Sequence, residues 1–471
     1  MTTDLQAIVD SEMPLPFGVR AGSGAALPGL NVNALQSIGV DPQSIIEKAA
    51  PKDHLAVVDR VNDPNDLKQA GWGVIFPAGI SPDVVAAIKP LLDRRKQQAG
   101  ELYKEFPDYQ FGQSARDWLT ARGVTLAVVD PAMGVPLYLL IVGGPSEVSF
   151  EFQYMLDCYW NVGRIHFDTP AEYAAYAEAV VKYEQDATVP TTRSSALWIT
   201  RNQADRATGL LHNQVGVPLA KGDGTNLPLG AAKNFKLGEF LAEQATRANL
   251  ESILRGDIPN GRPALLFTGS HGVAFDSSDK VAQREGQGAL LSQAWIKGEA
   301  ATPDQYLRAA DLPADLRTDG MIHFMFACYG GGCPARDTYD RSNGKPVPLM
   351  DAPIVARLPQ RMLAKGALAV LAHIDRAWAF SFQNDRGRPQ AQEFRNVLER
   401  VLKGDRLGQA TDTFNMRWSV LSADLQMLVE EHQVNDVPAP NLANRWVARD
   451  DARNYLILGD PAVRLRVEAM A

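Results

Sequence analysis

The sequence predicts an α/β protein with a mostly parallel sheet that is flanked by helices. Short apolar runs typical of buried strands alternate along the chain with segments of helical periodicity. The runs end at glycines or turns, and the alternation starts twice, near residue 72 and again near residue 195. Alternation of this kind is typical of a parallel sheet covered by helices, and its second start predicts two α/β units.

Length and composition narrow the class of protein. The chain has 471 residues, too many for one core, and its 45% hydrophobic and 22% charged content is typical of a globular protein. A net charge of −8 without a Lys/Arg cluster argues against nucleic acid or a membrane surface as a partner. The N-terminus lacks the features of a signal peptide, and the apolar runs are too short to span a bilayer. Three cysteines do not make a disulfide framework, so we expect a cytoplasmic protein.

The first two segments of the chain differ in composition. Residues 1–70 are rich in Pro, Gly and Asn, with a short helical stretch at 42–49, and we expect an irregular arm. Three roles are open for this arm: inhibition, recruitment of a partner, or bracing of the fold. Residues 71–194 form the first α/β unit, with strands expected at 72–76, 124–129 and 137–142 and helices at 83–100 and 170–185.

The second unit is predicted over residues 195–405, and residues 406–471 close the chain. We expect strands at 195–200, 263–268, 321–327 and 367–372, a short run at 288–292, and helices at 237–255 and 354–365. The stretch up to residue 230 is polar and glycine-rich. The closing segment has a long helix at 411–432 and a strand at 455–458, followed by Gly459-Asp-Pro461.

A histidine and a cysteine follow two of these strands. His271 lies in Gly269-Ser-His-Gly272 and Cys328 lies in Phe326-Ala-Cys-Tyr-Gly330. Each residue alone is typical of a turn or of a buried core. Together they indicate a cysteine nucleophile and its base, because the carboxyl ends of neighbouring parallel strands meet at one sheet edge. The glycines beyond both residues let a substrate approach the backbone, and freed N–H groups there can stabilise an oxyanion.

These motifs resemble those of clan CD cysteine peptidases, the group of caspases, gingipains, legumain, separase and CHAT-domain proteases. The matching elements are His271-Gly272 and Ala327-Cys328. Phe326 and Tyr329 replace the Gln and Arg of the caspase motif, which argues against a true caspase with its preference for aspartate. The nearer resemblance is to gingipain-type and CHAT-type members, and it covers about residues 130–470. It includes three further segments: 139–143, 162–164 and 458–461.

The resemblance implies roles for individual residues. It implies two caspase-like subdomains with the second one catalytic, Cys328 as nucleophile and His271 as base. The oxyanion hole would be the N–H groups of Gly272 and Cys328. The resemblance does not assign a carboxylate that orients His271, and Asp205 and Asp276 are the candidates.

The strand at 367–372 and its exit lie where this family builds its substrate subsites. Asp375 would pair with a basic residue before the cleaved bond, Trp378 would wall the pocket, and Tyr329 would contact the substrate. The alternative is that Trp378 is a core residue and that Asp375 caps a turn. The turn-rich stretch 336–351 lies where caspase-like enzymes carry a processing loop, although most polar loops of this kind have no such role.

The expected function is therefore a cysteine endopeptidase that cleaves a protein or peptide substrate through a thioester acyl-enzyme, without a cofactor or metal. The resemblance also suggests activation by a protein partner or ligand in a bacterial regulatory or defence pathway. One alternative is a catalytically silent caspase-like binding or scaffold module. The other is a metal-dependent hydrolase using His323, Cys328 and Cys333. Five residues along a strand put side chains on opposite faces, roughly 16–17 Å apart, so His323 and Cys328 would not share an ion.

Overall fold

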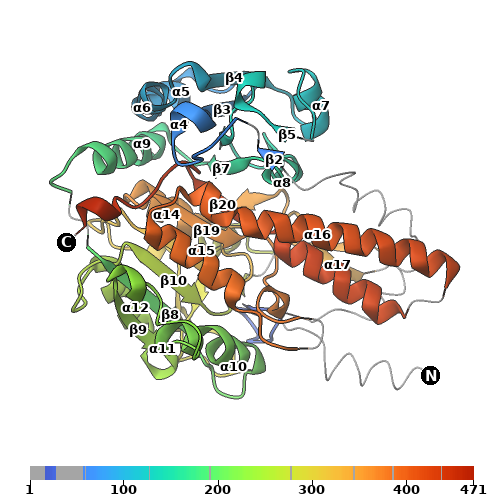
Figure 1. Cartoon of the computed structure of the whole chain (residues 1–471). Helices are drawn as coiled ribbons and strands as arrows, with labels where there is room; N and C mark the ends of the chain where they lie inside the picture. Colours follow the sequence, from blue (N-terminus) through green and yellow to red (C-terminus); the bar gives the residue numbers. More distant parts are fainter. Residues whose placement is uncertain are drawn as a thin grey trace.

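Ten strands form one large sheet that crosses the molecule and is flanked by helices (Figure 1). The computed structural model describes residues 16–27, 57–58, 60–126, 128–189, 192–275, 278–342, 345–384, 387–435 and 438–470. The helix expected at 42–49 and the candidate Asp276 lie outside these residues.

The order of the sheet combines both halves of the chain. It runs β4-β3-β6-β7-β20-β19-β14-β10-β8-β9, and every neighbouring pair is parallel except β19 and β20. The strands are β3 (Trp72–Pro77), β4 (Tyr103–Tyr109), β6 (Tyr138–Val142), β7 (Asn161–Ile165), β8 (Ser194–Ile199), β9 (Lys236–Leu241), β10 (Leu265–Gly269), β14 (Ile322–Phe326), β19 (Ala369–His373) and β20 (Tyr455–Gly459). The predicted mostly parallel α/β fold is confirmed.

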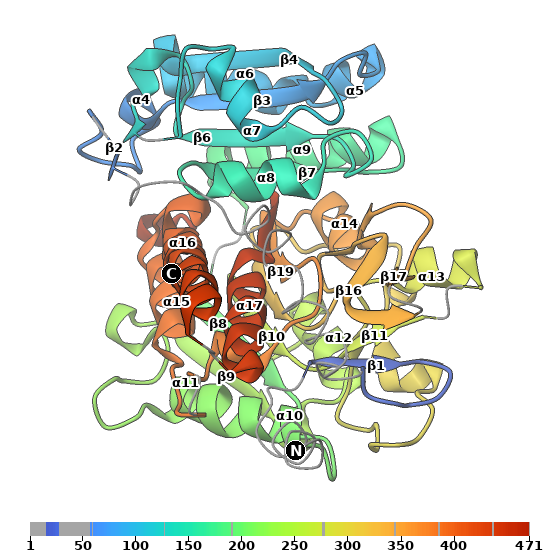
Figure 2. The ribbon, with the colours of Figure 1, turned by 90° about the vertical axis from the view of Figure 1, so that its right-hand side faces the viewer.

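Helices follow most strands. They are α4 (Leu67–Ala70), α5 (Pro82–Ala87), α6 (Lys89–Ala99), α7 (Ala115–Thr120), α8 (Phe150–Asp157), α9 (Pro170–Gln185), α10 (Arg206–Leu211), α11 (Val217–Lys221), α12 (Arg247–Arg255), α13 (Lys280–Gly286), α14 (Arg357–Ala364), α15 (Gln392–Lys403), α16 (Leu407–Val434) and α17 (Ala439–Arg453). The half with β3, β4, β6 and β7 lies above the other half in two views (Figures 1 and 2). Helices α16 and α17 form a long pair that extends to one side (Figure 1). Among the described residues, no helix combines the length and apolar character that a bilayer crossing needs.

The described residues also form smaller sheets. The largest has the order β1 (Gly18–Arg20), β11 (Gly272–Ala274), β12 (Leu290–Leu291) and β13 (Tyr306–Leu307). Strands β15 (Gly332–Cys333) and β18 (Ile354–Val355) pair, and so do β2 (Val57–Val58) and β5 (Val128–Val129). Part of the turn-rich stretch 336–351 forms a hairpin of β16 (Arg336–Ser342) and β17 (Lys345–Pro348).

The helix expected at 237–255 is wrong in its first half, which forms edge strand β9 beside β8. Leu237, Phe240 and Leu241 have helical spacing, but pairing with β8 outweighs this local preference. The helix begins only at α12, where Thr246 accepts a hydrogen bond from the Asn249 N–H. Two other predictions differ less from the structure. Strand β5 covers only the end of the strand expected at 124–129, and helices α10 and α11 lie in the polar stretch before residue 230.

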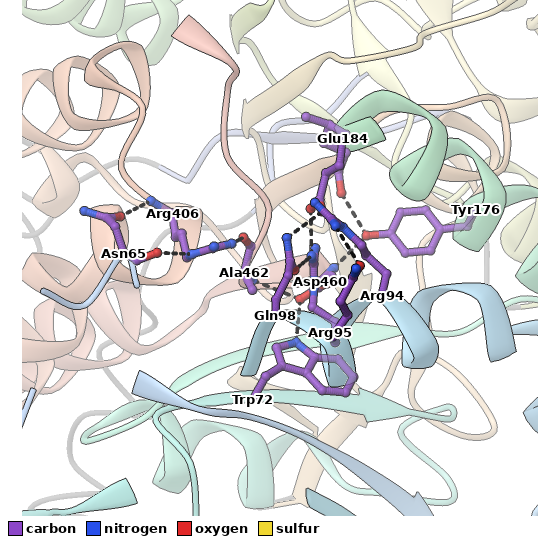
Figure 3. A network of polar contacts seen from close by, with 12 residues as sticks. Asn65, Trp72, Arg94, Arg95, Gln98, Tyr176, Glu184, Arg406, Asp460 and Ala462 are labelled. Carbon is purple, nitrogen blue, oxygen red and sulfur yellow. Dashed lines mark hydrogen bonds and ion pairs between the residues drawn. The ribbon is translucent and has the colours of Figure 1, made fainter. Parts of the chain in front are cut away.

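A buried carboxylate joins the two halves where β20 ends (Figure 3). Asp460 accepts hydrogen bonds from Trp72 Nε1 (3.0 Å) and Arg95 Nε (2.6 Å), and its own N–H donates to the Tyr176 hydroxyl (2.6 Å). Arg95 also pairs with Glu184 at 2.7 Å. The side chains of Asp460 and Arg95 are both fully buried. Residues of the first half therefore fix the strand that the last part of the chain inserts between β7 and β19.

A second link lies beside the first. The Nε of Arg406, just before α16, donates to the Asn65 carbonyl oxygen (2.8 Å), and its backbone N–H donates to the Asn65 side chain (2.8 Å). Its guanidinium also donates to the Ala462 carbonyl oxygen. Arg406 thus connects the segment before α4 with the turn after β20 (Figure 3).

We expect Asp460→Asn to destabilise the protein by about 3–5 kcal/mol, because it leaves the Arg95 charge buried with less compensation. Urea unfolding followed by circular dichroism measures this change. The control is Asp93→Asn, which removes the exposed Lys89–Asp93 pair, and we expect it to cost at most about 1 kcal/mol. Equal effects of the two variants would contradict the role of Asp460.

Candidate active site

His271 and Cys328 lie at the carboxyl ends of two adjacent parallel strands. Strand β10 ends at Gly269 and β14 ends at Phe326, and these two residues are directly opposite each other in the register. His271 and Cys328 each follow two residues later, so both lie at the same sheet edge, as the sequence predicts. Both side chains are buried. This edge of a parallel α/β sheet is where ligands usually bind.

Asp205 holds the imidazole of His271. It begins α10, where its carboxylate accepts hydrogen bonds from the Thr208 N–H (2.9 Å) and hydroxyl (2.7 Å). The His271 Nε2–H donates to the same carboxylate at 2.9 Å. Burial alone would raise the pKa of Asp205, but His271 and Thr208 outweigh burial and hold the pKa well below its ordinary value.

The other ring nitrogen of His271 is left without a hydrogen-bond partner among the described residues, although it is buried. Because Nε2 carries the proton that Asp205 accepts, Nδ1 of the neutral ring has a free lone pair. The Trp295 ring packs edge-on against the imidazole, with centroids 5.7 Å apart. The ring is therefore fixed in one orientation and retains one basic nitrogen.

The thiol of Cys328 is in contact with the exit of strand β19. The Ala377 N–H donates to Cys328 Sγ at 3.3 Å, and Sγ lies 3.7 Å from the Ala377 carbonyl oxygen. Burial raises the pKa of this thiol well above its ordinary value, and the Ala377 contact and Arg376 offset only part of the increase. The thiol is therefore protonated at neutral pH in this structure.

Two backbone N–H groups beside the thiol converge on one oxygen. The Gly272 N–H (2.6 Å) and the Cys328 N–H (2.9 Å) both donate to the carbonyl oxygen of Phe17. The backbones of residues 272 and 328 are very close, since a β-carbon at Gly272 would lie 1.8 Å from the Cys328 carbonyl oxygen. Only glycine fits at position 272, and this close approach brings the two donors together.

The segment that carries Phe17 crosses the site. The Phe17 N–H donates to the Ala377 carbonyl oxygen (3.0 Å), and Pro16 forms an antiparallel bridge with Trp378. From Gly18 the segment continues as β1, parallel to β11. Beyond the short apolar run Pro16-Phe-Gly-Val19, no local pattern in the sequence predicts this pairing.

The three expected substrate contacts lie close to this crossing point. The Trp378 N–H donates to the buried Asp451 carboxylate (3.0 Å), while its ring packs on Tyr339. The Tyr329 N–H donates to the Asp375 carbonyl oxygen (2.9 Å), and Tyr329 has a left-handed backbone with φ of 57°. The Asp375 carboxylate accepts a hydrogen bond from the Arg376 N–H at 2.7 Å.

The residues of the metal alternative have other partners. His323 Nε2 forms a hydrogen bond with the Thr268 hydroxyl at 2.8 Å, and burial lowers the pKa of His323 to about 3. Cys333 Sγ donates to the Pro334 carbonyl oxygen at 3.4 Å. Within the described ranges, no group of three His, Cys, Asp or Glu residues is arranged to hold a metal ion.

Comparison with known proteins gives a fold relationship. No family model matches the chain, and no curated protein matches it. A solved chain described as "Structure of Protease" is 13% identical, with a TM-score of 0.50 over 85% of this chain and 80% of its own. A chain of the "Complex of Porphyromonas gingivalis RgpB pro- and mature domains" is also 13% identical, with a TM-score of 0.46 over 84% and 80% of the two chains. The chain thus shares the fold of a solved protease.

The buried carboxyl of Asp375 gives a pH prediction. Burial, and then the nearby Asp337, raise the pKa of Asp375 to about 7. In the unfolded chain this carboxyl loses its proton near pH 4, so its contribution to stability falls as pH rises from about 4 to about 7. We expect Asp375→Asn to gain stability relative to the original chain over this window.

The Asp375→Asn variant must be compared with the original chain at each pH, because His323 and His373 change the stability of both chains in the opposite direction. Burial lowers the pKa of each to about 3, so their contributions rise with pH over part of the same window. Urea unfolding at several pH values between about 4.5 and 7.5 measures the difference in the free energy of unfolding between the variant and the original chain. A difference that does not change with pH would contradict the raised pKa.

Proposed function

We propose that this protein is a cysteine endopeptidase with Cys328 as nucleophile and His271 as general base. One observation carries the proposal: two N–H groups, of Gly272 and Cys328, converge on one carbonyl oxygen beside a thiol and an oriented imidazole. Convergent donors of this kind stabilise the negative oxygen of a tetrahedral intermediate in acyl transfer. The fold shared with a solved protease agrees with this reaction class.

The proposed reaction has two steps. His271 Nδ1 takes the proton of Cys328 as Sγ attacks the substrate carbonyl carbon, and the two N–H groups hold the resulting oxyanion. His271 then protonates the leaving amine, the C–N bond breaks and a thioester remains on Cys328. Water, deprotonated by the same imidazole, attacks the thioester carbonyl carbon, the C–S bond breaks to release the acid, and His271 returns the proton to Cys328 Sγ.

Asp205 has a positioning role in this proposal. Its carboxylate fixes the proton of His271 on Nε2 and stabilises the imidazolium that forms when Nδ1 takes the thiol proton. The thiol does not ionise by itself because burial raises its pKa, so it depends on transfer of the proton to His271.

The proposed catalytic groups all belong to the second half of the chain, residues 195–405. We therefore propose this half as the catalytic subdomain and residues 71–194 as a non-catalytic one that completes the sheet. Asp205, His271, Gly272 and Cys328 follow β8, β10 and β14, which are neighbours in the sheet.

The burial of Cys328 favours a second candidate function, the silent binding or scaffold module. With the thiol covered and protonated, the chain in this conformation presents no nucleophile to a substrate. The two candidates differ in whether uncovering Cys328 produces hydrolysis.

We expect Cys328→Ala to abolish hydrolysis of casein and of fluorogenic peptides, and Asp205→Asn to lower kcat by roughly 100-fold or more with a smaller change in KM. Each substitution is measured in the original chain and together with Gly18→Val, which we expect to expose the thiol because a β-carbon at Gly18 would lie 3.1 Å from Cys328 Sγ. Cys158→Ala, at a buried cysteine outside the site, is the control and should keep full activity. Absence of hydrolysis in both backgrounds would refute the peptidase and support the silent module.

A further inference from the structure

We propose that residues 16–19 occupy the candidate active site as a substrate does, with the Phe17–Gly18 peptide bond at Cys328, and that the site accepts an aromatic residue on the amino side of the bond it cuts. The segment thus covers the site, and the residue that it places there indicates which substrate residue the site prefers. The specificity rests on the proposed function, whereas the covering of Cys328 does not.

The backbone of the segment makes the contacts that a reacting peptide needs. The Phe17 carbonyl oxygen accepts both convergent N–H donors, and the preceding backbone runs antiparallel to residues 377–378. Addition of an extended peptide to an exposed backbone edge is a common mode of peptide recognition. A loop that only packed on the surface would not need to place one carbonyl on both donors.

Gly18 places the bond directly against the thiol. A β-carbon at Gly18 would lie 3.1 Å from Cys328 Sγ, 2.9 Å from Cys328 Cβ and 2.5 Å from Leu27 Cδ1. The main chain at Gly18 is therefore in contact with the nucleophile, and any larger residue would push the segment away from it. Only 1% of the surface of Cys328 remains exposed beneath this segment.

The side chain of Phe17 fills an apolar pocket. Its ring is fully buried and packs on the rings of Phe326 (centroids 4.9 Å apart), Phe382 (5.8 Å) and His271 (5.8 Å). A basic or acidic side chain in this position would lose its hydration among aromatic rings. The Asp375 carboxylate, which the sequence suggested as a partner for a basic residue, accepts the Arg376 N–H in this structure.

The chain on the carboxyl side of the bond is anchored separately. Residues 18–20 pair with β11, and the Leu27 N–H donates back to the Gly18 carbonyl oxygen at 2.8 Å. Val19 is fully buried in a small apolar cluster with Val273, Leu291, Trp295 and Tyr306. These contacts hold residues 18–27 as a compact hairpin, to which Phe17 contributes only the carbonyl oxygen that accepts the Gly272 N–H.

The segment is therefore also a substrate of its own chain. Attack of Cys328 Sγ on the Phe17 carbonyl carbon forms a thioester with Phe17 and breaks the C–N bond to Gly18. The thiol proton passes through His271 to the Gly18 nitrogen, which leaves as an amine. No other reactant is needed for this step.

The first test measures the covering of Cys328 in the full chain. We expect Gly18→Val to increase the rate of iodoacetamide labelling at Cys328 by about 10-fold or more, because the displaced segment exposes the thiol. Mass mapping of the Cys328 peptide separates it from the other two cysteines. Gly22→Val in the same hairpin is the matched control, since nothing lies within 4 Å of a β-carbon there. Equal labelling of the two variants would overturn the covering.

The second test measures specificity on the same proteins, with acetyl-Leu-Pro-Phe-aminomethylcoumarin and its Arg and Asp analogues. In the Gly18→Val chain we expect kcat/KM for the Phe peptide to exceed both analogues by roughly 100-fold, with much slower cleavage by the Gly22→Val chain. Preference for Arg or Asp would overturn the aromatic specificity. Faster labelling without any cleavage would refute the proposed peptidase but support the covering.

A second variant tests the covering of Cys328 independently, in case the Gly18→Val chain does not fold. Phe17→Asp keeps Gly18 and its neighbours but places a charge among Phe326, Phe382 and His271, so we expect it to release the segment as Gly18→Val does. Thermal unfolding of each variant confirms that the fold is retained. Labelling of a folded Phe17→Asp chain at the original rate would also overturn the covering.

Discussion

The structure depends on the insertion of β20 between β7 and β19. Without this strand the chain would have two separate sheets, each with an unpaired edge in the middle of the molecule. Strand β20 is parallel to β7 and antiparallel to β19. The order of the strands alone therefore does not determine where β20 lies. The buried carboxylate of Asp460 fixes the strand, because its partners Trp72, Arg95 and Tyr176 all come from the first half.

The joined sheet gives the candidate site a rigid base. Strands β19, β14, β10 and β8 are consecutive in the sheet, and the residues after their carboxyl ends make up the site. Asp205, His271 and Cys328 come from three successive strands of this set, and Ala377 follows the fourth. Each of these residues lies beyond the regular pairing of its strand, so its backbone or side chain is free to face a ligand.

The sequence predicted the parts of the site that depend on local patterns. His271 and Cys328 were predicted as a pair because each follows an apolar run, with glycine one or two residues later, and because a separation of 57 positions fits neighbouring strands. Asp205 was only one candidate carboxylate, since its contact with His271 spans 66 residues of chain. The role of Asp375 in substrate binding stays a prediction.

The remaining differences arise from long-range contacts. Strand β9 has helical spacing but pairs with β8, and no local pattern reveals that pairing. The place of Phe17 depends on donors at positions 272 and 328 and an acceptor at 377, all far away in the sequence. Of the three roles that the sequence leaves open for residues 1–70, the contacts of Phe17 favour inhibition.

The hairpin at 18–27 changes what happens after the bond at Phe17 is attacked. The pairing of Val19 and Arg20 with β11 and the Leu27–Gly18 hydrogen bond do not need the bond to Phe17, so the new amine at Gly18 stays beside the thioester instead of diffusing away. An oriented, tethered amine reaches an effective molarity of roughly 10⁵ M or more, and it competes with water for the acyl group. The two fragments would then reseal more often than they separate. A segment bound in this way behaves as a reversible inhibitor of an active enzyme. The rate at which the segment is lost is then set by dissociation of the hairpin and not by cleavage of the bond.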